Sequence, residues 1–156
     1  MSKHKINISV IGGHQVDKEI YDFAYEFGKI AAEKGWTIIC GGLSGVMEAV
    51  SKGVSEKEGT VIGILPGDDR NSGNRYLSFA IATGLGWIRN SLVVMNGDII
   101  VAINGSYGTL SEISYAFIMG KKVFSYKSWD IDGVEKVSNL SELIDKIELY
   151  LSNAEL

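Results

Sequence analysis

The stretch DIIVAINGSYGTLSEISYAF, residues 98–117, contains a strand, a glycine-rich turn and a helix in one continuous run. Residues 98–103 are the most apolar segment of the chain and predict a buried strand. Residues 104–109 supply the turn, and apolar residues then recur at three- and four-residue steps, as on one face of a helix. A strand that leads through a glycine turn directly into a helix is the repeating unit of α/β proteins.

The same unit recurs on both sides of this stretch. Strands are predicted at residues 6–11, 36–40, 60–65 and 123–126, with an ambiguous segment at 76–83. Amphipathic helices are predicted from Asp17 to Gly35, from Val46 to an end bracketed by Gly53 and Gly59, from 87 to 95, and after Ser138 or Asn139. Nearly continuous apolar strands that alternate with helices indicate a parallel sheet covered on both faces. We therefore expect an α/β fold, a Rossmann-like three-layer αβα sandwich with a mostly parallel sheet.

Length and composition favour one soluble domain that spans residues 1–156. The net charge of -4, without a cluster of Lys and Arg, argues against a nucleic-acid surface. The apolar run after the short basic segment 1–5 is too short for a signal sequence or a membrane span. The single Cys40 predicts a buried thiol in a reducing, cytoplasmic setting.

Two glycine turns at strand ends predict an anion site. Gly41, Gly42 and Gly45 precede one helix, and Gly105, Gly108 and Thr109 open another. Backbone N–H groups at a helix start are unpaired and carry the positive end of the helix dipole, so they suit a phosphate. Glycines that merely make tight turns are the alternative interpretation. In parallel sheets ligands bind beyond the carboxyl ends of the strands, where both turns are expected.

Familiar nucleotide and metal signatures are missing from the sequence. The turn after residues 36–40 has Cys40 where the dinucleotide fingerprint needs a glycine, and no G-x-x-x-x-G-K-[ST] run occurs. Two His and one Cys without metal-ligand spacing predict no metal site.

Arg89 and Glu112 are the charged residues most suited to a ligand. Arg89 lies in the otherwise uncharged segment 84–94, where a guanidinium can bind phosphate or form a structural ion pair. Glu112 is expected in the first helical turn after the glycines, facing the same cavity or complementing the helix dipole. His14 follows a strand end, where it could reach the ligand or be merely exposed, and it is assigned no catalytic role. The three tryptophans are expected in the core or an interface.

Four stretches together resemble the LOG-like superfamily: GGLSGVMEAVSKG at 41–53, GILPG at 63–67, TGLGWIRN at 83–90 and NGSYGTLSE at 104–112. That superfamily includes proteins long labelled possible lysine decarboxylases, cytokinin-activating phosphoribohydrolases and molybdenum cofactor carrier proteins. The resemblance covers most of the chain and implies a Rossmann-like fold and a dimer or tetramer. Lysine decarboxylation is not expected, because Lys52, Lys121 and Lys122 have the character of surface residues.

The resemblance implies two functions for one site. In the phosphoribohydrolases the Arg of an M-H-x-R-K motif and the Glu of a P-G-G-x-G-T-x-x-E motif cleave the base from a nucleoside 5′-monophosphate, and they match Arg89 and Glu112. Trp87 and Asn90 replace the His and Lys of the first motif, and Asn104 and Ser106 replace the Pro and one Gly of the second. The short length and the other stretches are closer to the molybdenum cofactor carriers, which bind a phosphate-bearing pterin without turning it over.

The leading prediction is therefore a protein that binds a small phosphate-bearing ligand, either the molybdenum cofactor or a nucleoside monophosphate, with no other cofactor required. The alternatives are a nucleoside 5′-monophosphate phosphoribohydrolase with Glu112 and Arg89 as catalytic residues, and an oligomeric module with a vestigial cavity. The predicted ligand-binding residues are Gly12, Gly13, Gly41, Gly42, Gly45, Met47, Arg89, Asn90, Gly105, Ser106, Tyr107, Gly108, Thr109 and Glu112.

Overall fold

A seven-stranded sheet forms the centre of the computed structural model, which describes residues 4–154. Its strands are β1 (Asn7–Gly12), β2 (Thr37–Cys40), β3 (Val61–Leu65), β4 (Phe79–Ala82), β5 (Ile99–Ile103), β6 (Lys122–Tyr126) and β7 (Glu135–Lys136). They lie in the order β4-β3-β2-β1-β5-β6-β7, and every neighbouring pair is parallel. The chain winds in one direction from β1 to β4 and in the other from β5 to β7, so the order reverses between β1 and β5.

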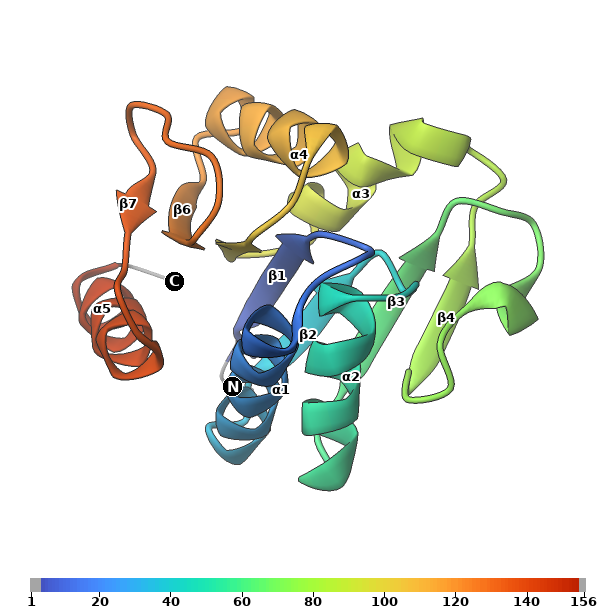
Figure 1. Cartoon of the computed structure of the whole chain (residues 1–156), viewed down its shortest axis with the longest axis horizontal. Helices are drawn as coiled ribbons and strands as arrows, with labels where there is room; N and C mark the ends of the chain where they lie inside the picture. The colour runs from blue at the N-terminus through green and yellow to red at the C-terminus, as the bar shows by residue number, and fades with distance from the viewer. Residues whose placement is uncertain (1–3, 155–156) are drawn as a thin grey trace.

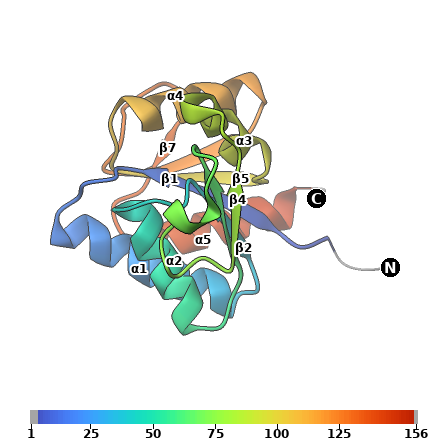
Figure 2. The same cartoon turned by 90° about the vertical axis from the view of Figure 1, so that its right-hand side faces the viewer.

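Helices cover both faces of this sheet (Figure 1). Figure 2 shows α3 (Arg89–Met95) and α4 (Tyr107–Ile118) on one face. On the other face lie α1 (Lys18–Glu33), α2 (Val46–Glu56) and α5 (Leu140–Asn153). Two short 3-10 helices, η1 (Arg70–Ser72) and η2 (Gly86–Ile88), lie in loops. The predicted Rossmann-like sandwich is confirmed, with a wholly parallel sheet.

Side chains of the central strand β1 point alternately to the two faces of the sheet, and this explains why the protein has two hydrophobic clusters. In β1, Ile8 and Val10 point to the α1 and α2 layer, where they pack in a cluster with Phe27. Ile11 points to the opposite face, where its cluster includes Val93 of α3 and other side chains of α4. Successive strand residues face opposite sides, and each side is apolar because helices cover both.

Close contact between α1 and α2 requires glycine at two positions. The helix end predicted between Gly53 and Gly59 is confirmed, because α2 ends at Glu56, and Gly53 therefore lies inside the helix. A methyl group at Gly53 would lie 2.0 Å from the carbonyl oxygen of Tyr25 in α1, and one at Gly28 would lie 2.3 Å from that of Val50. Glycine is therefore needed here for helix packing and does not end the helix.

Other elements differ from the expectation in detail. Strand β2 begins at Thr37, and Trp36 before it is buried in the core. The ambiguous segment at 76–83 contains β4, which is an edge strand. Strand β7 was not predicted, because two residues are too few to show a pattern. Asn139, one of two suggested caps, accepts the backbone N–H of Glu142 and starts α5.

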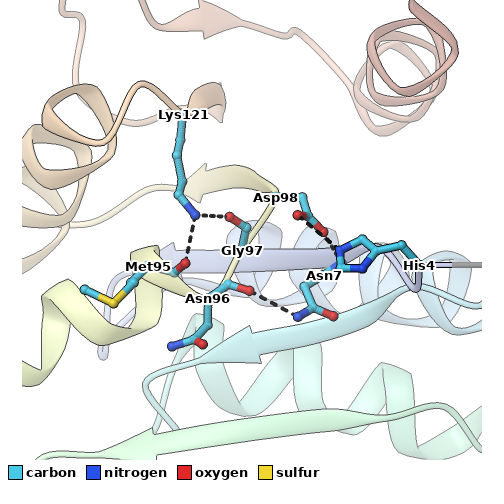
Figure 3. A network of polar contacts seen from close by, with 7 residues as sticks. All are labelled: His4, Asn7, Met95, Asn96, Gly97, Asp98 and Lys121. Atoms are coloured by element: carbon cyan, nitrogen blue, oxygen red, sulfur yellow. Dashed lines mark hydrogen bonds and ion pairs between the residues drawn. The ribbon is translucent and has the colours of Figure 1, made fainter. Parts of the chain in front are cut away.

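Polar contacts hold the amino edge of the sheet, where β1 and β5 begin (Figure 3). The Asp98 carboxylate accepts the backbone N–H of Asn7 at 2.9 Å and lies 3.8 Å from the His4 ring nitrogen. The Asn7 side chain donates to the backbone oxygen of Asn96 at 3.2 Å. These contacts fix the register at the edge opposite to the glycine turns.

Lys121 joins the same network and departs from its expected role as a surface residue. Its ammonium group donates to the backbone oxygen of Met95 at 2.8 Å and to that of Gly97 (Figure 3). Lys52, Lys121 and Lys122 are all partly buried. A cation at the end of α3 satisfies carbonyl groups that the helix leaves unpaired and complements its dipole.

Residues 1–3 of the predicted basic segment lie outside the described residues. Within residues 4–154, every helix is too short or too polar to cross a lipid bilayer.

Candidate functional site

A cavity of about 430 Å³ lies at the carboxyl edge of the sheet, where the strand order reverses. Its floor is formed by Val10 and Ile11 of β1, and the turns after β1 and β2 form one wall. The first turns of α3 and α4 contribute the opposite part of the lining. The two glycine turns at 41–45 and 105–109 therefore border one shared space, as the fold rule for parallel sheets predicts.

Two helices begin at this cavity without a side-chain cap. The cap residues are Gly45 for α2 and Ser106 for α4, and neither side chain accepts a backbone N–H. By contrast, the Asp17 side chain caps α1 and the Asn139 side chain caps α5. The first N–H groups of α4 and those that follow Val46 in α2 thus have no side-chain partner beside the cavity, where the positive ends of two helix dipoles also lie.

Contacts between neighbouring loops set the position of the 41–45 turn. The backbone N–H of Val46 donates to the Gly13 oxygen at 2.9 Å, and the Ser44 hydroxyl donates to the His14 oxygen at 2.9 Å. Gly45 has φ +66, and a side chain there would lie 2.3 Å from the same Gly13 oxygen. The turn after β2 is therefore fixed against the turn after β1.

Arg89 is the buried cation of the site. Its guanidinium donates to the Asn90 side-chain oxygen and, at 3.4 Å, to the backbone oxygen of Gly41. Its Nε is buried and has no hydrogen-bond partner among residues 4–154. Within the same range no carboxylate lies within 4.0 Å of the guanidinium, so the structural ion pair weighed as an alternative is not formed.

Asn90 connects this cation to the start of α4. Its amide nitrogen lies 3.3 Å from the Ser111 hydroxyl oxygen, and that hydroxyl donates to the Gly108 oxygen at 2.6 Å. Burial lowers the pKa of Arg89, and the nearby Glu112 opposes that effect. The guanidinium stays protonated in proteins, so the cavity wall carries a fixed positive charge.

Glu112 is buried and lies in the second turn of α4, which begins at Tyr107. The expectation that it lies in the first turn is therefore wrong, because the helix starts three residues earlier than the glycine-rich sequence suggested. Burial raises the pKa of its carboxyl to about 8, although Arg89 acts in the opposite direction. At neutral pH the carboxyl is mostly protonated and can donate a hydrogen bond into the cavity.

Eleven predicted binding residues line the cavity: Gly12, Gly13, Gly41, Met47, Arg89, Asn90, Ser106, Tyr107, Gly108, Thr109 and Glu112. The structure brings them together from four segments of the chain, and their role in binding stays a prediction. Gly42, Gly45 and Gly105 do not line it. These three have positive φ angles of 77°, 66° and 108°, so they shape the turns that present the lining residues.

Several lining residues were not among the predicted binding residues. Val10 and Ile11 border the cavity but are almost completely buried, and Leu43 supplies partly accessible apolar surface. His14 and Ser44 are exposed. Trp87, expected in the core or an interface, lines the cavity but is 83% exposed.

Trp129 supports the turn that leads into α4. Its indole nitrogen donates to the Ser106 oxygen at 2.9 Å, and its ring lies 5.9 Å from that of Tyr107. Within residues 4–154, no group of three or more His, Cys, Asp and Glu side chains is placed to hold a metal ion.

The lining offers backbone N–H groups and one guanidinium, which are groups that bind anions.

A family model described as the SLOG cluster4 family matches residues 5–151. The chain belongs to the SLOG cluster4 family. One relative, an uncharacterized protein of Archaeoglobus fulgidus, is 43% identical over 122 residues, which cover 78% of this chain and 80% of the relative. The LOG-like relationship expected from the four sequence stretches is thereby confirmed.

Two solved structures are similar to this SLOG cluster4 protein over nearly its whole length. The molybdenum cofactor binding protein of Rippkaea orientalis has a TM-score of 0.90 and 32% identity, covering 96% of this chain and 99% of that one. The molybdenum cofactor carrier protein MCP of Chlamydomonas reinhardtii has a TM-score of 0.88 and 28% identity, covering 96% and 100%. The present chain therefore has the architecture of these proteins.

Proposed function

We propose that this protein binds a phosphate-bearing pterin of the molybdenum cofactor type in the cavity beside β1 and β5, and holds it without turnover. The observation that carries the proposal is a buried guanidinium, free of any carboxylate within 4.0 Å among the described residues, next to two uncapped helix starts. An unpaired buried cation is costly unless an anion joins it. A phosphate supplies that anion.

The dimensions and walls of the cavity suit the remainder of such a ligand. About 430 Å³ is within the range that proteins use for small organic molecules. Leu43 and the exposed rings of Trp87 and Tyr107 offer apolar contact surface for a ring system, and Asn90 and Thr109 add polar groups beside Arg89. The similarity to two molybdenum cofactor proteins supports a pterin over other phosphate esters.

Binding can be tested with the cofactor and with stable probes. Molybdenum cofactor released from a molybdoenzyme under anaerobic conditions is mixed with the protein and passed over a gel-filtration column. Molybdenum and pterin fluorescence should co-elute with the protein. In parallel, ribose 5-phosphate and GMP are titrated by calorimetry. Absence of binding for the cofactor and for both probes would overturn the proposal.

Arg89→Gln tests the role of the guanidinium. Loss of a charged hydrogen bond should weaken each phosphate-bearing ligand by roughly 10- to 100-fold. The matched control is Arg75→Gln, since Arg75 is exposed and does not line the cavity. Equal affinity in Arg89→Gln and the wild type would show that the ligand does not use this cation.

A second candidate function, nucleoside 5′-monophosphate phosphoribohydrolase, is favoured by one observation. Glu112 is protonated at neutral pH and lines the same cavity as Arg89. Such a carboxyl can donate its proton to the leaving base as the bond between the base and the ribose carbon breaks. Water then attacks that carbon and gives up a proton to the carboxylate, which yields free base and ribose 5-phosphate and restores the acid. Release of both products from AMP or GMP, abolished in Glu112→Ala with binding intact, would favour the enzyme over the carrier.

A further inference from the structure

Arg89 and Asn90 are neighbours in the sequence, and both side chains are buried where α3 begins. Arg89 is 6% exposed and Asn90 2%. Helix α3 packs beside α4 on one face of the sheet (Figure 2). A polar side chain is costly to bury in such a position unless its donors and acceptors have partners. The partners of Asn90 therefore explain why an amide is buried here.

The surroundings of Asn90 allow one orientation of its amide. A guanidinium has only donors, so the atom that faces Arg89 Nη1 is the amide oxygen. The amide nitrogen then lies 3.3 Å from the hydroxyl oxygen of Ser111. That hydroxyl donates its own proton to the Gly108 oxygen at 2.6 Å, so its oxygen can accept from the amide. The reversed orientation would place a donor against a donor at Arg89.

These hydrogen bonds connect two parts of the site that come from different helices. Arg89 and Asn90 begin α3, whereas Gly108 lies in the first turn of α4. The row from Arg89 through Asn90 and Ser111 to Gly108 therefore fixes the guanidinium relative to the uncapped start of α4. Groups that bind one ligand together gain from being held in place before it arrives.

Asn90 holds the guanidinium without cancelling its charge. Nη1 of Arg89 donates to the neutral amide, and Nη2 donates to the backbone oxygen of Gly41 at 3.4 Å. Among residues 4–154, no carboxylate lies within 4.0 Å of this guanidinium. An aspartate has nearly the shape of asparagine but would neutralise the cation itself. A neutral amide suits a site whose anion binds and leaves.

We propose that Asn90 is a positioning residue, which aims the Arg89 guanidinium at a bound phosphate and leaves its positive charge for that phosphate. Asn90 borders the cavity but is only 2% exposed, so it acts through Arg89 and not through contact with the ligand. The effect on ligands rests on the proposed function. The hold on the guanidinium does not, and it is tested with the protein alone.

Nitrogen-15 NMR of the arginine side chains tests the hold on the guanidinium without ligand. The chain has three arginines, and Arg70 and Arg75 are exposed, so loss of a signal in Arg89→Gln identifies Arg89. In the wild type this guanidinium should rotate slowly about its Cζ–Nε bond, because its two Nη atoms have different partners. Asn90→Ala removes one partner and should speed the rotation. Unchanged rotation overturns the proposal.

Asn90→Asp tests whether the neutral amide matters. The new carboxylate pairs with the guanidinium, so ribose 5-phosphate should bind roughly 10- to 100-fold more weakly in calorimetry, as in Arg89→Gln. Asn90→Ala keeps the charge of Arg89 but not its position, and should bind about tenfold more weakly. The matched control is Asn71→Asp, which makes the same change of charge at an exposed residue away from the cavity and should bind as the wild type does. Circular dichroism and urea unfolding check that each variant is folded.

The outcomes separate the role of Asn90 from the proposed function. If the wild type binds ribose 5-phosphate and Asn90→Asp binds it equally well, the role of Asn90 is overturned and the proposed function stands. An equal loss of affinity in Asn71→Asp would reveal a general effect of negative charge and also overturn that role. If the wild type binds neither ribose 5-phosphate, GMP nor the cofactor, the proposed function fails and the part of Asn90 in phosphate binding fails with it.

Discussion

Gly41 lies directly beneath the guanidinium of Arg89. A methyl group at this position would lie 2.8 Å from Arg89 Nη2 and 2.7 Å from the Met47 sulfur. We expect Gly41→Ala to push the guanidinium out of place and to weaken ribose 5-phosphate binding by about tenfold or more, measured by calorimetry. Gly67→Ala is the control, since a methyl there meets no atom within 4 Å. Unchanged affinity in Gly41→Ala would contradict this account of Arg89.

Glu112 makes stability depend on pH in an unusual direction. Burial raises the pKa of its carboxyl from 4.5 to about 8 in the folded chain, whereas the unfolded chain keeps the ordinary value. Between these values the folded state binds one more proton than the unfolded state. The contribution of this group to the free energy of unfolding therefore falls as the pH rises from about 4.5 to about 8.

Glu112→Gln should remove that contribution. The free energy of unfolding of the variant, measured in urea, should be nearly that of the wild type at pH 4 and higher at pH 9, by at most a few kcal/mol. The exposed Glu58→Gln serves as control and should show little difference at either pH. A variant that loses stability equally at both pH values would show that Glu112 acts through packing and not through its proton.

Packing between elements overrides helix propensity at the α1 and α2 contact. Gly53→Ala introduces a better helix former, yet its methyl would lie 2.0 Å from the Tyr25 oxygen. We expect a loss of roughly 1–3 kcal/mol in urea unfolding, because overpacking forces the helices apart. Gly108→Ala in α4 is the comparison, as its methyl meets only the Asn90 amide at 3.7 Å. A stabilised Gly53→Ala would refute the tight contact.

The elements that were predicted have a clear local sequence pattern, whereas the features that were missed depend on contacts with other elements. Strands β1, β2 and β5 could be predicted because long apolar runs end at glycines, and α1 because its apolar period is regular and Asp17 caps it. The end of α2 between Gly53 and Gly59 was predicted correctly, but the sequence does not show that Gly53 contacts another helix. The start of α4 was placed too late because glycine and serine are poor helix formers.

Some residues of the candidate site could be predicted from the sequence and others could not. Arg89 and Glu112 stood out because charged residues are rare in their segments, and the glycines because they repeat at strand ends. The apolar part of the lining could not be predicted, since Leu43 and Trp87 carry no sequence pattern that separates a residue beside a cavity from one in the core. That distinction depends on the tertiary arrangement.

For the whole molecule, the net charge leads to a prediction about salt. Two copies with a net charge of -4 repel one another. Added salt screens the repulsion beyond about 10 Å and leaves apolar contact intact. Self-association should therefore strengthen or stay constant as the salt concentration rises, as measured by sedimentation equilibrium. Weaker association at high salt would point to an interface made by charged side chains.

The reversal of strand order between β1 and β5 also has a dynamic consequence. These two strands pair along five positions and join the two oppositely wound halves of the chain. A ligand that contacts both glycine turns would connect the two halves across the β1 and β5 pair. Amide protons of β1 and β5 would then exchange with heavy water more slowly when the ligand is bound, while those of the edge strand β7 would exchange at an unaltered rate.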